Sequence, residues 1–235
     1  MRLLDLTLPT PAENLACDEA LLDACEAGGP EVLRFWEAQN YFVVVGYGNH
    51  VATEVEVEAC RREGIPILRR CSGGGTVLQG PGCLNYAVVL RLESNSAWQT
   101  IPGANRVIME RNRAALESLL GRSVRVRGFT DLALGELKFS GNAQRRHRQA
   151  LLFHGTFLLD FDLSLIQRLL PLPSKQPDYR QDRAHAQFVT NLNVPETDVK
   201  QALRLAWGAT ATLSEPPDFG RLLAEKYNRA EWNLR

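Results

Sequence analysis

The sequence predicts an α/β protein, and three observations carry that prediction. A chain of 235 residues can bury a sizeable core, in one large domain or two small ones. Two long segments, residues 11–26 and 102–120, have helical patterning with clear start and stop residues. Short apolar or alternating segments around them predict strands. No internal repeat or domain boundary is visible, so we expect a single domain over residues 1–235.

The N-terminal half is expected to mix helices and strands. Thr10–Glu13 is a capping box with proline at the first helical position, and Gly28 stops the helix that it opens. A second helix is predicted to start at Thr53–Glu56, another capping pattern, and to end at Gly64. Strands are expected at residues 32–37, 41–47, 65–70, 76–79 and 84–92. The second of these strands is apolar enough to be central.

The C-terminal half begins with the helix over residues 102–120, which Gly121 terminates. Its apolar residues fall close to one face. Residues 124–127 alternate as a strand with one wet face. A β-meander is predicted next, at residues 131–134, 137–146 and 150–162, followed by short helices near 163–170, 196–207 and 218–228. The polar, proline-containing stretch 171–187 is too long for a passive connector and is predicted to be a mobile flap or binding loop.

Composition excludes several classes of function. The formal net charge is zero, which argues against a nucleic-acid partner. No apolar segment is long enough for a signal peptide or a membrane span. The charge is nevertheless uneven, since residues 121–150 carry seven basic and two acidic side chains. That excess suits either a positive surface for a phosphate or acidic protein partner, or a solvated hairpin face.

The five cysteines form no C-x-x-C pair, and their odd number argues against a complete disulfide framework. A reducing, cytoplasmic location is therefore expected. The four histidines show no metal-ligand spacing, so a structural zinc site is not predicted.

Two segments point to chemistry. Arg69–Thr76 is a glycine run with two arginines at its start, and such a loop lets backbone amides approach an anion closely. Lys138–Ala143 then supplies a lysine on a predicted strand. Together they suit a phosphate-bearing acyl intermediate.

Period-two alternation places Lys138, Ser140 and Asn142 on one side of that strand and Phe139 on the other. Lys138 must then face solvent or line a cavity. On the next strand, His154 could lie near Lys138 across the pairing. Taken alone, both residues also fit plain structural roles, as a surface charge and a satisfied strand histidine.

Five motifs are spread along the chain: Arg69–Val77, Gly82–Tyr86, Thr130–Leu132, Lys138–Gln144 and His154–Thr156. In this order they resemble the lipoate–protein ligase family, in the biotin/lipoate ligase superfamily. Asn14–Ala16, Val189–Leu192 and Glu231–Asn233 match further landmarks. The resemblance implies an α/β (α+β) fold: a mixed, largely antiparallel sheet flanked by helices. The biotin branch's G-R-G-R-x-G-R segment is absent, which disfavours biotin.

The resemblance also implies a reaction. Lipoate or octanoate and ATP would form an acyl-AMP, and the acyl group would pass to a lysine of a lipoyl carrier protein or domain. Lys138 would be the catalytic cation that contacts the carbonyl and α-phosphate oxygens, and Asp131 matches the acid that serves Mg²⁺. Substrate and adenylate binding is implied for Arg70, Ser72, Gly73, Gly74, Gly75, Asn85, Ser140, Gly141, Asn142, Ala143, His154 and Gly155.

The chain departs from the family in places. Gly46–Asn49 lacks the arginine of the usual G-R-x-Q-N segment, and Cys83 stands where asparagine is common. Larger bacterial ligases carry a C-terminal accessory domain, which we do not expect within these 235 residues. Three explanations are open for a chain without this domain. A separate subunit could supply it, the enzyme could work without it, or the enzyme could only transfer a preformed acyl group.

Two other functions are open. The first is an ATP-independent octanoyl- or lipoyl-transferase that works through a cysteine thioester, which needs an accessible thiol with a depressed pKa. Cys71 and Cys83 are the only cysteines near the predicted pocket, and a buried hydrophobe is the default for each. The second is a catalytically silent module that binds lipoyl carriers, against which Lys138 and Asp131 argue. Arg145, Arg146 and Arg148 could dock an acidic carrier or serve solubility alone.

Overall fold

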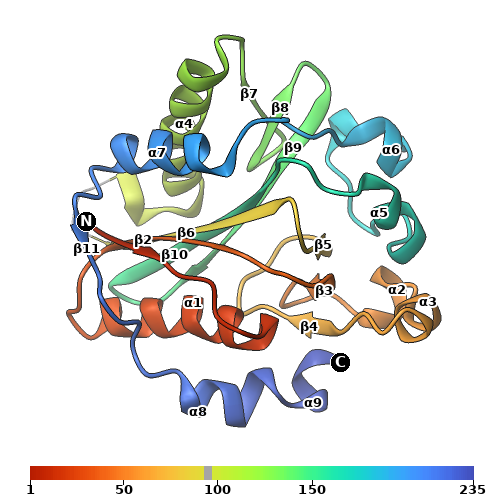
Figure 1. Ribbon diagram of the computed structural model, residues 1–235, viewed down its shortest axis with the longest axis horizontal. Coiled ribbons are helices and arrows are strands. Elements are labelled where there is room, and N and C mark those ends of the chain that lie inside the picture. Colours follow the sequence, from red (N-terminus) through yellow and green to blue (C-terminus); the bar gives the residue numbers. More distant parts are fainter. Residues whose placement is uncertain (93–96) are drawn as a thin grey trace.

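The computed structural model describes residues 1–92 and 97–235, and a mixed eight-stranded sheet forms its centre (Figure 1). The strand order is β11-β1-β2-β6-β10-β9-β8-β7. β1 pairs in parallel with β11 and β2, and the other pairings of this sheet are antiparallel. The strands are β1 (Arg2–Asp5), β2 (Val32–Glu37), β6 (Cys83–Arg91), β7 (Arg125–Arg127), β8 (Asp131–Leu134), β9 (Leu137–Arg146), β10 (Ala150–Leu158) and β11 (Ala211–Thr212). The predicted fold class is confirmed.

A second sheet has three strands in the order β4-β3-β5. They are β3 (Phe42–Val45), β4 (Ile67–Arg69) and β5 (Val77–Gln79). β3 is the central strand, as its sequence predicts, and all four of its residues are completely buried. Val43 and Val45 face one apolar cluster and Phe42 and Val44 another, which explains why this strand is apolar throughout instead of alternating.

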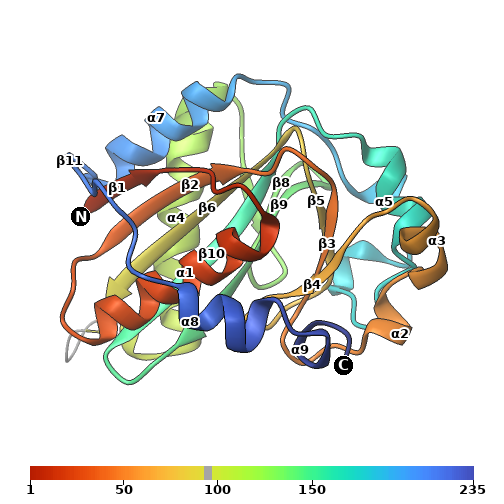
Figure 2. The same ribbon diagram turned by 60° about the horizontal axis from the view of Figure 1, so that its bottom comes forward.

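Helices cover both faces of the large sheet (Figures 1 and 2). α4 (Ile101–Leu120) and α7 (Glu196–Trp207) lie on one face, hereafter the α4 face, and α1 (Pro11–Glu26) lies on the other, the α1 face. On the α1 face, Cys17 and Leu21 of the helix pack with Ala87 and Leu152 of the sheet. The capping box predicted for α1 is present, and Gly121 ends α4 in the left-handed conformation.

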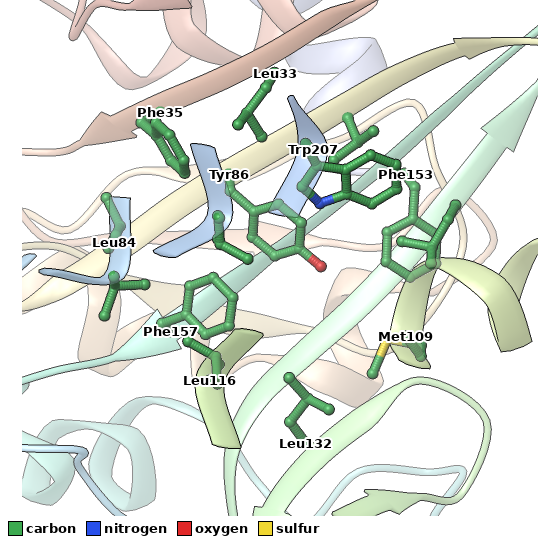
Figure 3. Packing of buried hydrophobic residues seen from close by; sticks show 14 of the residues in the cluster. Leu33, Phe35, Leu84, Tyr86, Met109, Leu116, Leu132, Phe153, Phe157 and Trp207 are labelled. Carbon is green, nitrogen blue, oxygen red and sulfur yellow. The ribbon is translucent and has the colours of Figure 1, made fainter. Parts of the chain in front are cut away.

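The core on the α4 face is the largest apolar cluster, and Figure 3 shows its packing around Tyr86. The Tyr86 ring stacks on Phe157, with 4.9 Å between ring centroids. Its hydroxyl is satisfied in this apolar setting, because it donates to Asn142 Oδ1 at 2.6 Å and accepts from Asn112 Nδ2 at 2.8 Å. The indole N–H of Trp207 donates to Asn112 Oδ1 at 2.8 Å and completes this buried polar network.

The helix predicted over Thr53–Gly64 is wrong as a single element. The structure has two short helices there, α2 (Val51–Glu54) and α3 (Val57–Arg62), and Thr53 caps neither. Val55 is extended between them and is buried in the cluster beside the small sheet. Burial of this apolar side chain therefore outweighs the local capping pattern.

The C-terminal segment lies along α1 and the small sheet (Figure 2). It consists of α8 (Gly220–Leu222), a π-helical turn η3 (Leu223–Tyr227) and α9 (Ala230–Asn233), which covers most of the helix predicted near 218–228. Lys226 Nζ pairs with Glu19 of α1 at 2.7 Å, and the Tyr227 hydroxyl donates to the same carboxylate at 2.7 Å. The segment is thus held by a partly buried charge as well as by apolar contacts.

The remaining elements are short. They are α5 (Leu163–Leu169), α6 (His185–Phe188) and the 3₁₀ turns η1 (Ala97–Gln99) and η2 (Asp178–Arg180). β1, β11, α6 and α9 were not predicted, and β10 ends at Leu158 instead of reaching residue 162. Within the described ranges, no helix combines the length and apolar character needed to cross a bilayer.

Candidate functional site

A cavity of about 370 Å³ lies between the two sheets, and most of the predicted site residues line it. Its polar wall comes from the glycine loop, β9 and β10, and its apolar wall from residues such as Val44, Leu78 and Phe188. The predicted residues that line it are Arg70, Gly74, Gly75, Asn85, Asp131, Lys138, Ser140, Gly141, Asn142, Ala143, His154 and Gly155. Ser72 is completely buried and Gly73 is exposed, and neither lines the cavity.

Arg70 shapes the glycine loop from beneath. Its guanidinium donates to the carbonyl oxygens of Gly73 at 2.6 Å and Gly75 at 2.7 Å, and its Nε donates to Ser72 Oγ at 3.0 Å. Burial lowers the pKa of Arg70 to about 10, so the side chain is still a cation at neutral pH. Because the carbonyls turn toward the cation, an anion in the cavity can be met by amide groups of the same loop.

Arg69, expected beside Arg70 at the loop entrance, points elsewhere. It is completely buried and donates to the carbonyl oxygens of Gly46 at 2.8 Å, Asn49 at 2.6 Å and Trp232 at 2.9 Å. It therefore joins the C-terminal segment to the turn after β3. The expectation that both arginines at the start of the glycine run serve the anion site is wrong, because of these two only Arg70 lines the cavity.

His154 links the glycine loop to α1. Its Nε2 lies 2.5 Å from Ser72 Oγ, and its Nδ1 lies 3.1 Å from Asp18 Oδ2. The hydrogen bonds are consistent when Nδ1–H donates to the carboxylate and Nε2 accepts from the serine hydroxyl. The Asp18 carboxylate in turn pairs with buried Arg34 at 2.5 Å. The His154 imidazole is thus held by Ser72 and Asp18, and its partners do not include Lys138.

Asp18 is a site residue that sequence reasoning missed. It is 2% exposed and lines the cavity from α1. Burial alone would raise its pKa, but Arg34 and His154 reverse this and hold the pKa below its ordinary value of 3.8. The available signal was a pair of polar residues, Asn14 and Asp18, one helical turn apart in an otherwise apolar helix. Both contact Arg34.

Lys138 enters the cavity as an ion pair. Its Nζ lies 2.8 Å from Asp131 Oδ1, and the side chains are 25% and 14% exposed. The other carboxylate oxygen of Asp131 accepts from the Tyr179 hydroxyl at 2.8 Å. Tyr179 belongs to the stretch 171–187, which supplies further cavity-lining residues from Pro171 to His185. The position of this stretch along the cavity therefore supports the prediction that it is a binding loop.

The strict alternation predicted for β9 is wrong. The register against β8 shifts so that Leu132 pairs with Ser140 and Ala133 with Lys138, which leaves Phe139 as an extra residue in a β-bulge. A Cβ on Gly141 would meet Lys138 Nζ at 2.8 Å, whereas a Cβ on Gly155 would meet Asn142 Oδ1 at 1.8 Å. Gly155 is paired with Asn142, and its neighbour Thr156 is paired with Gly141. Neighbouring pairs in a sheet face opposite sides, so the contact of Gly141 with Lys138 and the contact of Gly155 with Asn142 lie on opposite faces. Lys138 is therefore on the α1 face and Asn142 on the α4 face.

Asn142 is satisfied within the protein. Its Nδ2 donates to the Thr130 carbonyl at 2.6 Å and to Ser140 Oγ at 3.2 Å, and its Oδ1 accepts from Tyr86. The Thr130 hydroxyl donates back to the Asn142 carbonyl at 2.7 Å. These bonds fix the turn before β8 against β9, which places Asp131 beside Lys138.

All five cysteines are free and buried. Burial raises the pKa of Cys71 and of Cys83 to about 12 in each case. Across residues 1–92 and 97–235, no thiol lines the cavity. A thiol with a raised pKa and no access to the cavity lacks both properties of a nucleophile.

The donors around Asp131 do not fit a magnesium site built by the protein. Asp131 is a single carboxylate whose oxygens already accept from Lys138 and Tyr179. No cluster of three or more potential ligands occurs in the described part of the chain. Mg²⁺ can be held by one carboxylate when substrate phosphates supply other ligands, but these two bonds would first have to open. In this structure Asp131 serves as the partner of Lys138 and Tyr179, and its role in metal binding stays a prediction.

Comparison with known proteins identifies the class to which this fold and cavity belong. A family model described as the lipoyl protein ligase A/B catalytic domain matches residues 10–203. The chain therefore belongs to this family of enzymes, as its motifs predict. The family includes proteins named as ligases and as octanoyltransferases, so membership by itself leaves the choice between the two open.

Relatives of known name span nearly the whole chain. A putative lipoate-protein ligase A of Aeropyrum pernix is 32% identical over 97% of this chain and 86% of its own length. Lipoate-protein ligase A subunit 1 of Thermoplasma acidophilum is 27% identical, over 97% of this chain and 95% of its own. Octanoyltransferase LipM of Geobacillus kaustophilus is also 27% identical, over 100% and 98%.

Solved structures agree in fold. A putative lipoate protein ligase from T. acidophilum with bound lipoic acid superimposes with a TM-score of 0.84 at 26% identity, over 100% of this chain and 99% of the other. A bi-partite lipoate protein ligase, described with its E2 lipoyl domain from the same organism, gives 0.84 at 26%, over 99% and 95%. A lipoate-protein ligase A bound with ATP gives 0.83 at 26%, over 99% and 98%.

Proposed function

We propose that this chain is an ATP-dependent lipoate–protein ligase. In the first half-reaction, a carboxylate oxygen of lipoate or octanoate attacks the α-phosphorus of ATP, and pyrophosphate leaves. In the second, the amine of a carrier lysine attacks the acyl carbonyl carbon. The carbon–oxygen bond to AMP breaks, AMP leaves, and the attacking nitrogen loses a proton to give an amide.

One observation carries the choice of a ligase over a cysteine-dependent transferase. The cavity holds a lysine amine and an arginine-held glycine loop, whereas Cys71 and Cys83 are buried with raised pKa values. A thioester route needs a thiolate that can reach the acyl group. An acyl-adenylate route needs cations and amide donors around a phosphate, which the cavity offers.

The proposed roles follow from the contacts. Gly74 and Gly75, which line the cavity, present their amides to the phosphate of the adenylate, and Arg70 shapes their loop through Ser72, Gly73 and Gly75. Lys138 stabilises the charge that grows on the carbonyl and phosphate oxygens. A donor of this kind typically contributes about 3 kcal/mol to the transition state, or roughly a hundredfold in rate. Asp131 orients Lys138 while the site is empty of anions.

The remaining predicted residues act as the wall of the site. Gly141 leaves room for the Lys138 amine, and a side chain at Gly155 would displace Asn142. We propose that Gly141 and Ala143 are small so that substrate can approach β9 closely, whereas Gly155 leaves room for Asn142. Asn85, Ser140, Asn142 and His154 position these strands and the glycine loop, with Asn85 and Ser140 both nearly fully buried.

The descriptions of related structures support the substrates and the partner that we propose for this chain. One related structure holds lipoic acid, another holds ATP, and a third is a bi-partite ligase described with a lipoyl domain. We propose lipoate or octanoate and ATP as substrates and a lipoyl carrier domain as acceptor. A separate accessory subunit is proposed because a relative is named as subunit 1. Five free thiols suit a cytoplasmic enzyme.

The decisive experiment measures pyrophosphate release from MgATP with lipoate, octanoate or biotin, in parallel with octanoyl transfer from an acylated carrier without ATP. The proposal predicts pyrophosphate release with lipoate or octanoate and none with biotin. Octanoyl transfer without ATP that Cys83→Ser abolishes would establish the transferase instead, which the LipM relatives make the second candidate. Carrier binding without either activity would indicate a silent module. The assay is run with and without an accessory subunit, so that a missing partner is recognised.

A further inference from the structure

Phe129 is the most exposed large apolar side chain of the described residues, at 88% exposure, yet it stands on the rim of the cavity. It lies in the turn between β7 and β8, two residues before Asp131, which pairs with Lys138. Single exposed apolar residues are ordinary on a protein surface. An aromatic ring held out at the mouth of a reactive cavity is a different case, because whatever enters the cavity passes beside it.

The turn holds Phe129 outward by its own structure. Gly128 has a φ of 54°, and a Cβ there would lie 3.2 Å from Pro177 and 3.6 Å from the Tyr179 ring, so the turn rests on the stretch 171–187. On the other side, the Thr130 hydroxyl and carbonyl both bond Asn142 of β9. The residues on either side of Phe129 are therefore fixed, and the exposure of the ring is a property of a supported turn.

The exposure also indicates what kind of ligand the ring contacts. A ligand bound inside the cavity would touch side chains that face its interior, which are mostly buried. A ring that is 88% exposed at the mouth of the cavity leaves most of its surface for a larger body that sits outside. In the proposed function, the carrier must bring its lysine to the acyl-adenylate while the rest of the carrier stays outside.

The charge of residues 121–130 indicates which kind of partner surface would bind here. Residues 121–130 contain three arginines and no acidic residue. Arg122 and Arg125 are exposed, and Arg127 pairs with Glu136 and lies over the Tyr179 ring. A surface of this sign favours a partner whose contacting face is acidic. Aromatic and arginine side chains are also the residue types that dominate binding at interface hot spots.

We propose that Phe129 and the arginines of residues 121–130 form the docking surface for the acyl carrier, with Phe129 as its apolar anchor. The partner is a protein domain that presents an acceptor lysine beside an apolar contact and an acidic face. This inference rests on the proposed function, because it assumes that a protein lysine enters the cavity.

The test separates the two half-reactions. Phe129→Ala is compared with wild type in lipoate-dependent ATP–pyrophosphate exchange, which needs no carrier, and in acylation of a purified, unmodified E2 lipoyl domain. We expect exchange to be unchanged and the KM for the lipoyl domain to rise about tenfold or more, as for a hot-spot residue. Phe129→Leu should restore most of the affinity. Leu205→Ala, at a residue 70% exposed on α7, is the matched control and should change neither reaction.

Two results would overturn the inference. A raised KM for ATP with an unchanged KM for the lipoyl domain would assign Phe129 to nucleotide binding. Identical kinetics for Phe129→Ala and wild type would show that Phe129 has no role in carrier binding.

If wild type shows no exchange at all, the ligase proposal has failed separately. Docking is then read by fluorescence anisotropy with the labelled lipoyl domain. Weaker binding by Phe129→Ala supports the inference, and equal binding ends it.

Discussion

His154 Nε2 lies 2.5 Å from the hydroxyl oxygen of Ser72, so a strand histidine on the floor of the cavity braces the glycine loop. The same hydroxyl accepts from Arg70, whose guanidinium holds two loop carbonyls. Behind His154 stands the buried pair of Asp18 and Arg34. A continuous set of buried hydrogen bonds therefore runs from α1 to the loop proposed to hold the adenylate.

His154→Ala should weaken both stability and nucleotide binding. The substitution leaves Ser72 and buried Asp18 each without one partner, which typically costs about 1–3 kcal/mol of unfolding free energy. A less constrained loop should also raise the KM for ATP in the exchange reaction. Urea unfolding and exchange kinetics measure the two effects. His50→Ala, at an exposed histidine before α2, is the control, and a His154 variant indistinguishable from it would refute the bracing role.

Asp18→Asn should be destabilised at neutral pH and should lose part of the acid sensitivity of wild type. Removing the charge leaves Arg34 buried without its anion, which costs on the order of 3 kcal/mol. The pKa of Asp18 is lowered in the folded protein, so the unfolded chain binds more protons below the ordinary value of 3.8. Its contribution is present above that pH and lost as the pH falls below it.

Unfolding free energies measured by circular dichroism between pH 3 and pH 7 test this linkage. Wild type should lose stability more steeply below about pH 4 than Asp18→Asn does. Glu58→Gln, at an exposed acid on α3, is the control and should follow wild type. Parallel curves for wild type and Asp18→Asn would show that Asp18 does not titrate with a lowered pKa.

The thiols should be inert in the native protein. With a pKa of about 12, Cys71 and Cys83 would each be thiolate in only about one molecule in ten thousand at pH 8, and both are also shielded from reagent. Labelling with a thiol reagent should be slow for the folded chain and reach five groups in denaturant. A single thiol that reacts rapidly in the native state would revive the thioester mechanism.

Gly155→Ala should destabilise the fold strongly. A Cβ at that position would lie 1.8 Å from Asn142 Oδ1 and 2.7 Å from the carbonyl oxygen of Gly141. Strands β9 and β10 would have to separate or Asn142 would have to leave Tyr86, and overpacking of this kind costs about 1–3 kcal/mol. Thermal unfolding measures the loss. Gly48→Ala, where a Cβ meets open space, is the matched control. Equal melting temperatures for the two variants would contradict the packing described here.

Local patterns predicted the regular elements well. The capping box at Thr10, the short turn between the strands at 131–134 and 137–146 and the helix end at Gly121 are decided by residues adjacent in sequence, and the structure has all three. Long-range packing decided the failures. Val55 interrupts a helix because it is buried against the small sheet, and the four-residue strand β1 is too short to show alternation.

The sequence predicted which residues belong to the candidate site, but it did not predict how they are arranged. The bulge at Phe139 moved Lys138 to the face opposite Asn142, which no count of residues along β9 could reveal. Arg69 and Arg70 are neighbours with opposite tasks, because alternation sends one to the C-terminal segment and the other to the glycine loop. Asp18 joins the site only through the packing of α1 on β2 and β10.

The central claim is that the Lys138 amine serves acyl activation in the cavity shaped by Arg70. Lipoate-dependent ATP–pyrophosphate exchange by Lys138→Ala tests it most directly, with Lys200→Ala on α7 as the control. We predict that the Lys138 variant loses about a hundredfold or more in rate while it stays folded and the control keeps the wild-type rate. A folded Lys138→Ala protein that exchanges pyrophosphate at the wild-type rate would contradict the account.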